Sequence, residues 1–260
     1  MTFDQINRRV ICLPKTGSSF VANVFSSQNA VHEFDFRTIA DHALNFSDNY
    51  QKTWDYLKNR SVQLNGKVDV STSLIFFLND YIELIGEPSS VFLIRDPFEW
   101  ICSMIKYAYK VMSIGELTMD NSWRVDYGRL FVGNMDGVKD LLHPKTGKKY
   151  FVNAIARKLL ETWLVYTKQI VNSASRYDSD LSNLFLTSEL SSIDFFETAC
   201  KLFELDLTPP LSLFVKVNAT NADDEVADEL AKFLPWLYEN RLLNLFEIND
   251  YLCRFESMSI

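Results

Sequence analysis

Residues 14–20 read PKTGSSF and combine a charge, hydroxyl groups and backbone freedom in the way that a phosphate group requires. Lys15 supplies a positive charge, and Gly17 lets the backbone approach a ligand closely. The hydroxyl groups that can donate hydrogen bonds belong to Thr16, Ser18 and Ser19. We therefore predict that this segment is a phosphate-binding turn.

The letters PKTG recur at residues 144–147, and the flanking sequence separates the two copies. The first copy follows the apolar run RRVICLP and precedes a stretch in which Phe20 and Val24 are four residues apart. This pattern predicts a strand, a tight turn and an amphipathic helix, whose N-terminus and turn N–H groups stabilise an anion. No apolar run precedes the second copy, so we interpret it as a surface β-turn.

A second basic residue follows another apolar run. Residues 90–94 read SVFLI and predict a buried strand, and Arg95 comes directly after it. Asp96 and Pro97 suit the N-cap and the first position of a helix, so Asp96 is interpreted as a cap without a catalytic role. Because the carboxyl ends of parallel strands line the ligand crevice, we expect Lys15 and Arg95 at the same edge of the sheet.

Strands and helices alternate along the chain, which predicts an α/β fold with a central parallel sheet covered by helices on both faces. The runs that predict strands are 8–14, 30–36, 67–73, 90–94 and 181–190. The stretches that predict helices are 16–27, 53–60, 74–86, 97–112, 151–170, 192–205 and 223–247. Residues 113–149 are rich in Gly, Asn and Asp, and we interpret them as an insertion or lid within a single domain of residues 1–260.

The composition argues against several classes of protein. The net charge of -8 opposes nucleic-acid binding, which depends on Lys and Arg. The four cysteines form no CxxC pair and there are only three histidines, so we expect neither a disulfide framework nor a metal site. No signal-peptide core and no apolar run of transmembrane length is present, so we expect a cytoplasmic protein without a membrane partner.

Two motifs together resemble the sulfotransferases that use 3′-phosphoadenosine-5′-phosphosulfate (PAPS). PKTGSSF is similar to their 5′-phosphosulfate loop, which reads PK-[ST]-G-[ST]-[ST] followed by an aromatic or apolar residue. Their 3′-phosphate motif is an Arg at a strand end, then Asp or Asn and Pro, with a Ser eight residues after the Arg. Arg95, Asp96, Pro97 and Ser103 match this spacing.

The resemblance implies a P-loop-NTPase-like sulfotransferase fold, PAPS as the cofactor, adenosine 3′,5′-bisphosphate as its product, and no metal. The residues that it implies for cofactor binding are Lys15, Thr16, Gly17, Ser18, Ser19, Phe20, Arg95 and Ser103. Weaker similarity extends to VDVSTSLIFFLNDYI, ETWLVY, LFLTSEL and VKVNAT. The late basic loop of the cytosolic enzymes is not evident in the sequence.

The segment AVHEFDF, residues 30–36, contains two candidates for a general base. It resembles the Glu-Val-His-Phe-Phe-Asp segment of the carbohydrate sulfotransferases, whose Glu is the base, but Ala30 replaces that Glu. His32 matches the His of the family, and Glu33 is a displaced carboxylate. Because side chains alternate along a strand, only one of the two is expected to face the crevice, and His32 is preferred for its near-neutral pKa. His42 is a third candidate, expected on a helix.

The predicted reaction is an in-line transfer of a sulfuryl group to a hydroxyl of a sugar or small-molecule acceptor, with Lys15 at the leaving oxygen. One alternative is a nucleotide or small-molecule kinase with a degenerate phosphate loop, although the loop lacks the GxxxxGK[ST] pattern of a Walker A motif. The other alternative is a nucleotide-binding relative without catalytic activity. Preference for adenosine 3′,5′-bisphosphate over ATP distinguishes a sulfotransferase from the kinase. Cofactor binding without turnover identifies the non-catalytic relative.

Overall fold

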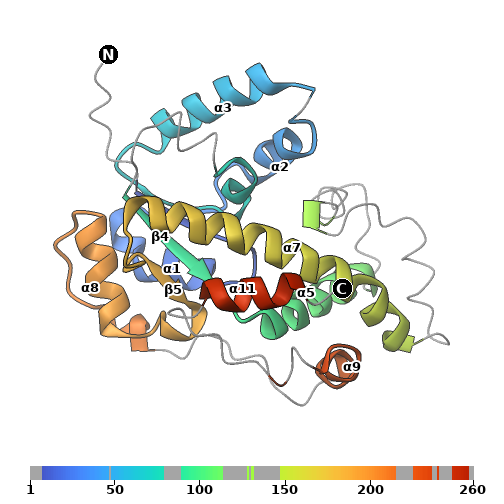
Figure 1. Cartoon of the computed structure of the whole chain (residues 1–260). Coiled ribbons are helices and arrows are strands. Elements are labelled where there is room, and N and C mark those ends of the chain that lie inside the picture. The colour runs from blue at the N-terminus through green and yellow to red at the C-terminus, as the bar shows by residue number, and fades with distance from the viewer. Residues whose placement is uncertain are drawn as a thin grey trace. The chain divides into compact units, whose positions relative to one another are not determined.

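The computed structural model describes residues 8–46, 48–78, 89–113, 128, 130–131, 147–214, 225–235, 239 and 248–257. The chain divides into two compact units. The first unit comprises Met1–Ile94 and Tyr166–Asn218, and the second comprises Arg95–Val165 and Ala219–Ile260. Figure 1 labels several elements of each unit, among them β4, β5 and α8 of the first and α5, α9 and α11 of the second.

A five-stranded sheet forms the centre of the first unit. Its strands are β1 (Arg8–Cys12), β2 (Val31–His32), β3 (Val68–Val70), β4 (Ser89–Ile94) and β5 (Leu184–Leu186). All neighbouring strands are parallel, and their order across the sheet is β2-β3-β1-β4-β5. The expected α/β fold with a parallel sheet is therefore confirmed.

The register places the carboxyl ends of the two central strands side by side, since Cys12 of β1 pairs with Leu93 of β4. After β1 the chain continues to β2 on one side of the sheet, and after β4 it continues to β5 on the other side. In open α/β sheets, ligands bind outside the carboxyl ends of strands where the winding reverses in this way. The turn that follows Cys12 leaves the sheet at this reversal.

One face of the sheet is covered by α1 (Ser18–Val24) and α8 (Ile193–Leu202). Alternate strand residues point toward these helices because successive side chains of a strand lie on opposite faces. The fully or nearly fully buried strand residues in this core are Val10, Cys12, Val68, Val70, Val91 and Leu93. Phe25, which follows α1, stacks on Phe196 of α8 with ring centroids 5.7 Å apart.

The opposite face contacts α3 (Tyr50–Gln63), the 3₁₀ helix η2 (Thr72–Phe77) and the end of α7. Phe92 of β4 stacks on Tyr177 of α7, and Asp69 of β3 pairs with Arg60 of α3. The remaining elements of this unit are α2 (Phe36–Leu44), η1 (Ser26–Gln28), η5 (Thr187–Glu189) and η6 (Leu211–Phe214). The helix expected at 74–86 is a 3₁₀ helix as far as Phe77, and residues 79–88 lie outside the described part.

The second unit contains α5 (Pro97–Ser113), the first part of α7 (Gly147–Tyr177), α9 (Glu225–Phe233) and α11 (Ile248–Ser257). The side chain of Asp96 accepts a hydrogen bond from the N–H of Glu99 at 3.0 Å, which confirms its expected role as a helix cap. Most of the expected insertion at 113–149 lies outside the described residues. Among the described helices, none has both the length and the apolarity required to cross a bilayer.

Candidate functional site

The PKTG turn after β1 has an unusual backbone. Lys15 has a φ of 64° and Gly17 a φ of 94°, so both adopt the left-handed conformation. This conformation is strained for Lys15, because its Cβ approaches the following carbonyl. Successive N–H groups in such turns form concave anion sites. The Lys15 side chain is exposed while Pro14 and Thr16 on either side of it are buried, so the lysine projects from a fixed backbone.

A segment remote in sequence packs against this turn. The Thr187 hydroxyl, directly after β5, lies 3.2 Å from the carbonyl oxygens of both Thr16 and Ile94 and can donate its proton to either. A Cβ added to Gly17 would lie 2.4 Å from Cδ1 of Leu190, so a side chain there would force Leu190 or the turn to move. The turn after β1 is thus fixed from the carboxyl ends of β4 and β5. No pattern in the sequence pointed to Thr187 and Leu190, although both follow a strand whose end lies at this edge of the sheet.

The three hydroxyls of the loop differ in what they contact. The Thr16 hydroxyl donates to the carbonyl of Leu13, so in this structure it stabilises the turn itself. The hydroxyls of Ser18 and Ser19 lie 3.1 and 3.3 Å from Nε2 of His32. The three hydroxyls expected to donate to a phosphate therefore have different partners. That of Thr16 bonds within the turn, and those of Ser18 and Ser19 are directed toward His32. Phe20 packs against the core cluster between α1 and the sheet.

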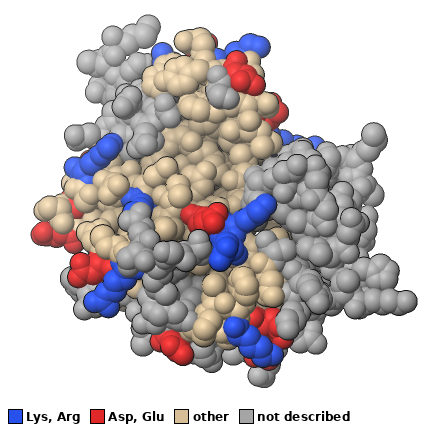
Figure 2. Space-filling model, turned by 45° about the vertical axis from the view of Figure 1, so that its right-hand side comes forward, with Lys and Arg blue, Asp and Glu red and all other residues tan. Residues whose placement is uncertain are grey.

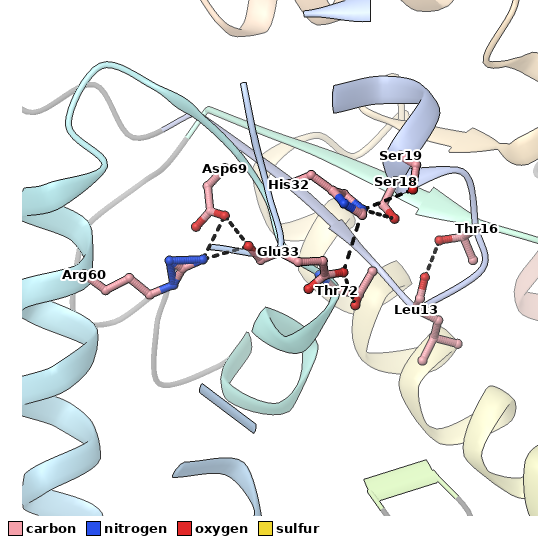
Figure 3. A network of polar contacts seen from close by, with 10 residues as sticks. Leu13, Thr16, Ser18, Ser19, His32, Glu33, Arg60, Asp69 and Thr72 are labelled. Atoms are coloured by element: carbon pink, nitrogen blue, oxygen red, sulfur yellow. Dashed lines mark hydrogen bonds and ion pairs between the residues drawn. The ribbon is translucent and has the colours of Figure 1, made fainter. Parts of the chain in front are cut away.

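The alternation of strand side chains on which the choice between His32 and Glu33 depended does not hold. The strand β2 ends at His32, and Glu33 has a φ of 53°, so the alternation of strand side chains does not extend to it. Nε2 of His32 and Oε1 of Glu33 are 3.9 Å apart. Figure 3 shows His32 between the hydroxyls of Ser18 and Ser19 on one side and Glu33 on the other. The structure thus brings both base candidates together beside the loop.

Glu33 is a mostly buried carboxyl with a raised pKa. Its Oε1 accepts hydrogen bonds from the Thr72 hydroxyl at 2.6 Å and from the Thr72 N–H at 3.2 Å. Burial raises the pKa of Glu33 to about 7, although the two bonds from Thr72 oppose this change. The other oxygen, Oε2, is buried and has no hydrogen-bond partner within the described part of the chain. A carboxyl with this pKa exchanges a proton near neutral pH.

The pKa of His32 changes in the opposite direction from that of Glu33. Partial burial lowers the pKa of His32 below its usual value, since removal from water disfavours the charged ring. The neutral ring has one nitrogen that donates and one that accepts, so it can hydrogen-bond to the Ser18 and Ser19 hydroxyls in either tautomer. The sequence-based preference for His32 relied on its ordinary pKa. In the folded protein the pKa of Glu33 is raised to about 7 while that of His32 is lowered, so the ordinary pKa of histidine no longer favours His32.

The third candidate, His42, lies on α2 as expected. Its Nδ1 is 2.9 Å from the hydroxyl of Thr53 on α3, and its ring stacks on Tyr56 with centroids 4.5 Å apart. These contacts join α2 to α3. His42 is therefore explained by packing between two helices and is not grouped with the loop.

The 3′-phosphate candidates belong to the second unit. Arg95 directly follows β4; its side chain is 8% exposed, and its Nε lies 3.2 Å from Oε2 of Glu99. The Arg95 carbonyl accepts a hydrogen bond from Nε1 of Trp163 at 2.9 Å, so its backbone is fixed by α7. Ser103 lies on α5 and is partly buried. Of the second PKTG copy, Gly147 begins α7, and residues 144–146 lie outside the described residues.

Charges of both signs are present on the face that Figure 2 draws, where Lys and Arg side chains and Asp and Glu side chains are scattered among uncharged residues. Opposite charges on one face partly cancel at longer range.

Comparison with protein-family models gives no match to this chain, and a search of curated proteins also gives none. The site must accordingly be interpreted from its own chemistry. It combines an exposed lysine on a constrained turn, two serine hydroxyls bonded to a histidine, and a carboxyl that titrates near neutral pH. Such a group of residues can bind an anion and remove a proton from a neighbouring hydroxyl.

Proposed function

We propose that this protein is a PAPS-dependent sulfotransferase that acts on a hydroxyl group of a sugar or small-molecule acceptor. The observation that carries the proposal is the connection between the phosphate-type loop and a proton acceptor: Nε2 of His32 lies 3.1 Å from Ser18 Oγ and 3.9 Å from Glu33 Oε1. A loop that only terminates a strand requires no titrating carboxyl beside it. Transfer to a hydroxyl requires both an anion site and a base.

In the proposed reaction the acceptor oxygen attacks sulfur, the bond between sulfur and the 5′-phosphate oxygen breaks, and adenosine 3′,5′-bisphosphate leaves. Lys15 stabilises the charge that develops on the leaving oxygen, as preorganised cations do in phosphoryl transfer. Glu33 takes the proton of the acceptor hydroxyl. We assign this role to Glu33 in place of His32, because His32 is already bonded to the loop hydroxyls.

His32 has a different role in this proposal. It holds the Ser18 and Ser19 hydroxyls in position beside the carboxyl, and so fixes the distance between the anion site and the base. Arg95 and Ser103 are assigned to the 3′-phosphate on the resemblance of RDPFEWICS to the family motif. The buried side chain of Arg95 and the hydrogen bond that its carbonyl accepts from Trp163 suit a fixed position, which specific recognition of a second phosphate needs.

The first experiment measures ligand binding by thermal unfolding. A ligand that binds only the native state stabilises it, by about 2.7 kcal/mol at one hundred times its Kd. Adenosine 3′,5′-bisphosphate is expected to raise the Tm, whereas ATP and adenosine 5′-monophosphate raise it much less. Equal shifts with all three nucleotides would contradict the 3′-phosphate assignment and favour a kinase or a general nucleotide-binding protein.

The second experiment measures transfer of radiolabelled sulfate from PAPS to a panel of sugars and small alcohols. The Glu33→Gln variant is expected to lose roughly 10²–10⁴-fold in rate, the usual contribution of a positioned base, without weaker bisphosphate binding. The rate of the wild-type protein is expected to rise with pH through about 7, since the base must be deprotonated. Bisphosphate binding without transfer to any acceptor would identify a non-catalytic relative.

A further inference from the structure

A buried ion pair lies next to the proposed base. Nη2 of Arg60 on α3 is 2.9 Å from Oδ1 of Asp69 on β3, and the two side chains are 0% and 3% exposed. Pairs of this kind contribute little net stability, because removing both charges from water costs about as much as their attraction returns. Stability of the fold is thus a weak reason for placing this pair here.

Ser71 closes the pair into a group of three that we call the Arg60 triad (Arg60, Asp69 and Ser71). The Ser71 hydroxyl accepts a hydrogen bond from Nη2 of Arg60 and donates one to Oδ1 of Asp69, both at 2.7 Å. Each member therefore bonds to the other two. Within the described part of the chain, Nε and Nη1 of Arg60 have no hydrogen-bond partner, so the side-chain hydrogen bonds of Arg60 there are made by Nη2 within the triad.

The contacts of Arg60 fall on both sides of the hydrogen bonds between Thr72 and Glu33. Ser71, which Arg60 binds, immediately precedes Thr72 in the chain. Phe34 immediately follows Glu33, and Arg60 Cζ lies 5.2 Å from the centroid of its ring. Figure 3 shows Arg60 and Asp69 on the side of Glu33 away from His32. One side chain thus holds the segment that carries the donors and also the segment that carries the carboxyl.

We propose that the Arg60 triad is a positioning device that holds Thr72 in the place from which it donates two hydrogen bonds to Glu33. This proposal rests on the proposed function only for the role of Glu33 as proton acceptor. The contacts that hold Thr72 and Glu33 in place do not depend on that function. The triad acts through Thr72 and does not itself touch the acceptor. Its purpose is to keep Oε1 of Glu33 directed and the carboxyl available in its charged form.

The electrostatic surroundings of Glu33 indicate which change to expect. The charged or titratable groups that face it, among the residues described, are His32 on β2, Arg60 on α3, Asp69 on β3 and the Cys12 thiol on β1. Arg60 lowers the pKa of Glu33 and Asp69 raises it, so the pair partly cancels. The bonds from Thr72 lower the pKa of Glu33 more than either charge of the pair changes it. Displacing Thr72 should therefore raise that pKa.

The test removes one hydroxyl from the triad. Substitution of Arg60 or Asp69 would leave a buried charge unpaired and endanger folding, so the variant is Ser71→Ala. The matched control is Ser73→Ala, which removes a fully buried hydroxyl two residues away that has no hydrogen-bond partner among the described residues. Carboxyl ¹³C NMR of the unliganded protein, with Glu33 assigned by its Gln variant, measures the pKa directly. We expect Ser71→Ala to raise the pKa of Glu33 by about 0.5–1 unit, and Ser73→Ala to leave it unchanged.

A second pair of variants tests the step from the triad to Glu33. Thr72→Val removes the hydroxyl donor and is expected to raise the pKa of Glu33 at least as much, whereas Thr72→Ser retains the donor and restores the wild-type value. In transfer assays, the acid limb of the pH profile of kcat should shift by the same amount in Ser71→Ala, with KM for PAPS unchanged.

The experiments distinguish failure of the positioning role of the Arg60 triad from failure of the sulfotransferase assignment. If the pKa shifts as expected but no transfer is found, the triad stands and the sulfotransferase assignment fails. If Ser71→Ala and Ser73→Ala give the same pKa as the wild type, or the same shift as each other, the positioning role is refuted whatever the activity. The NMR measurement needs neither cofactor nor acceptor, so it also decides the matter if Ser71→Ala is less stable than the wild type but still folds. If Ser71→Ala does not fold, the Thr72→Val and Thr72→Ser pair decides it, and an unchanged pKa in Thr72→Val overturns the proposal.

Discussion

The Leu190 side chain occupies the space that a side chain at position 17 would need: a Cβ on Gly17 would lie 2.4 Å from Cδ1 of Leu190. The two residues are far apart in sequence and meet because β1, β4 and β5 are neighbours in the sheet. The same segment carries Thr187, whose hydroxyl reaches the Thr16 carbonyl. The position of Lys15 therefore depends on the segment that follows β5. This segment is remote in sequence, since 171 positions separate Thr16 from Thr187.

The Gly17→Ala variant is expected to destabilise the protein by roughly 2–4 kcal/mol, because it adds a collision with Leu190 to the strain of a φ of 94°. Gly66→Ala is the matched control. Gly66 has a φ of 74° but nothing within 4 Å of an added Cβ, so only the backbone strain of about 1–2 kcal/mol applies. Urea unfolding measures both. Equal losses in the two variants would show that the turn moves away from Leu190 at no cost.

The repeated PKTG sequence provides its own control for the loop. Lys15→Ala is expected to reduce transfer by roughly 10²–10³-fold and to weaken adenosine 3′,5′-bisphosphate binding, since it removes the cation expected at the leaving oxygen. Lys145→Ala changes the same residue type in the same four-residue context. We expect it to leave both properties near wild type, as measured by sulfate transfer and calorimetry. Loss of activity in Lys145→Ala would contradict its interpretation as a surface turn.

The contacts of His32 predict an effect on nucleotide affinity. His32→Ala removes the ring that bonds to the Ser18 and Ser19 hydroxyls, so the loop is less ordered before the ligand binds. We expect bisphosphate affinity to fall roughly 3–10-fold, corresponding to about one hydrogen bond. His42→Ala is the control, since its bond to Thr53 joins two helices and should affect Tm but not affinity. Unchanged affinity in His32→Ala would separate the histidine from the anion site.

The raised pKa of Glu33 predicts how stability depends on pH. The folded state holds the proton up to about pH 7, whereas an ordinary carboxyl releases it near 4.5, so between these values the folded state binds more protons. The free energy of unfolding therefore falls as pH rises through this range, and Glu33→Gln should avoid that loss. Relative to wild type, we expect Glu33→Gln to gain on the order of 3 kcal/mol between pH 4 and pH 8, measured by denaturant unfolding. A difference that does not vary with pH would mean that Glu33 titrates normally.

Local patterns in the sequence were sufficient for the class of fold. Alternating apolar runs and amphipathic stretches predicted all five strands of the sheet and most of the described helices, because burial on a sheet or on a helix face imposes a short-range period. The capping role of Asp96 was also readable, since a cap depends only on the next few residues. The extent of β2 was not readable: seven residues were expected to be extended, and the strand has two, Val31 and His32.

The candidate site likewise has features that follow from the local sequence and features that depend on tertiary contacts. The sequence by itself determined the residues of the loop and its position between a strand and a helix, because PKTGSSF is contiguous and its setting follows from its neighbours. Only the tertiary structure decided what surrounds it. The register of parallel strands places Thr187 and Leu190 at the loop, and the left-handed backbone at Glu33 places its carboxyl beside His32. These contacts join residues from separate strands and helices, and burial then changes the proton affinities of His32 and Glu33, which no local pattern encodes.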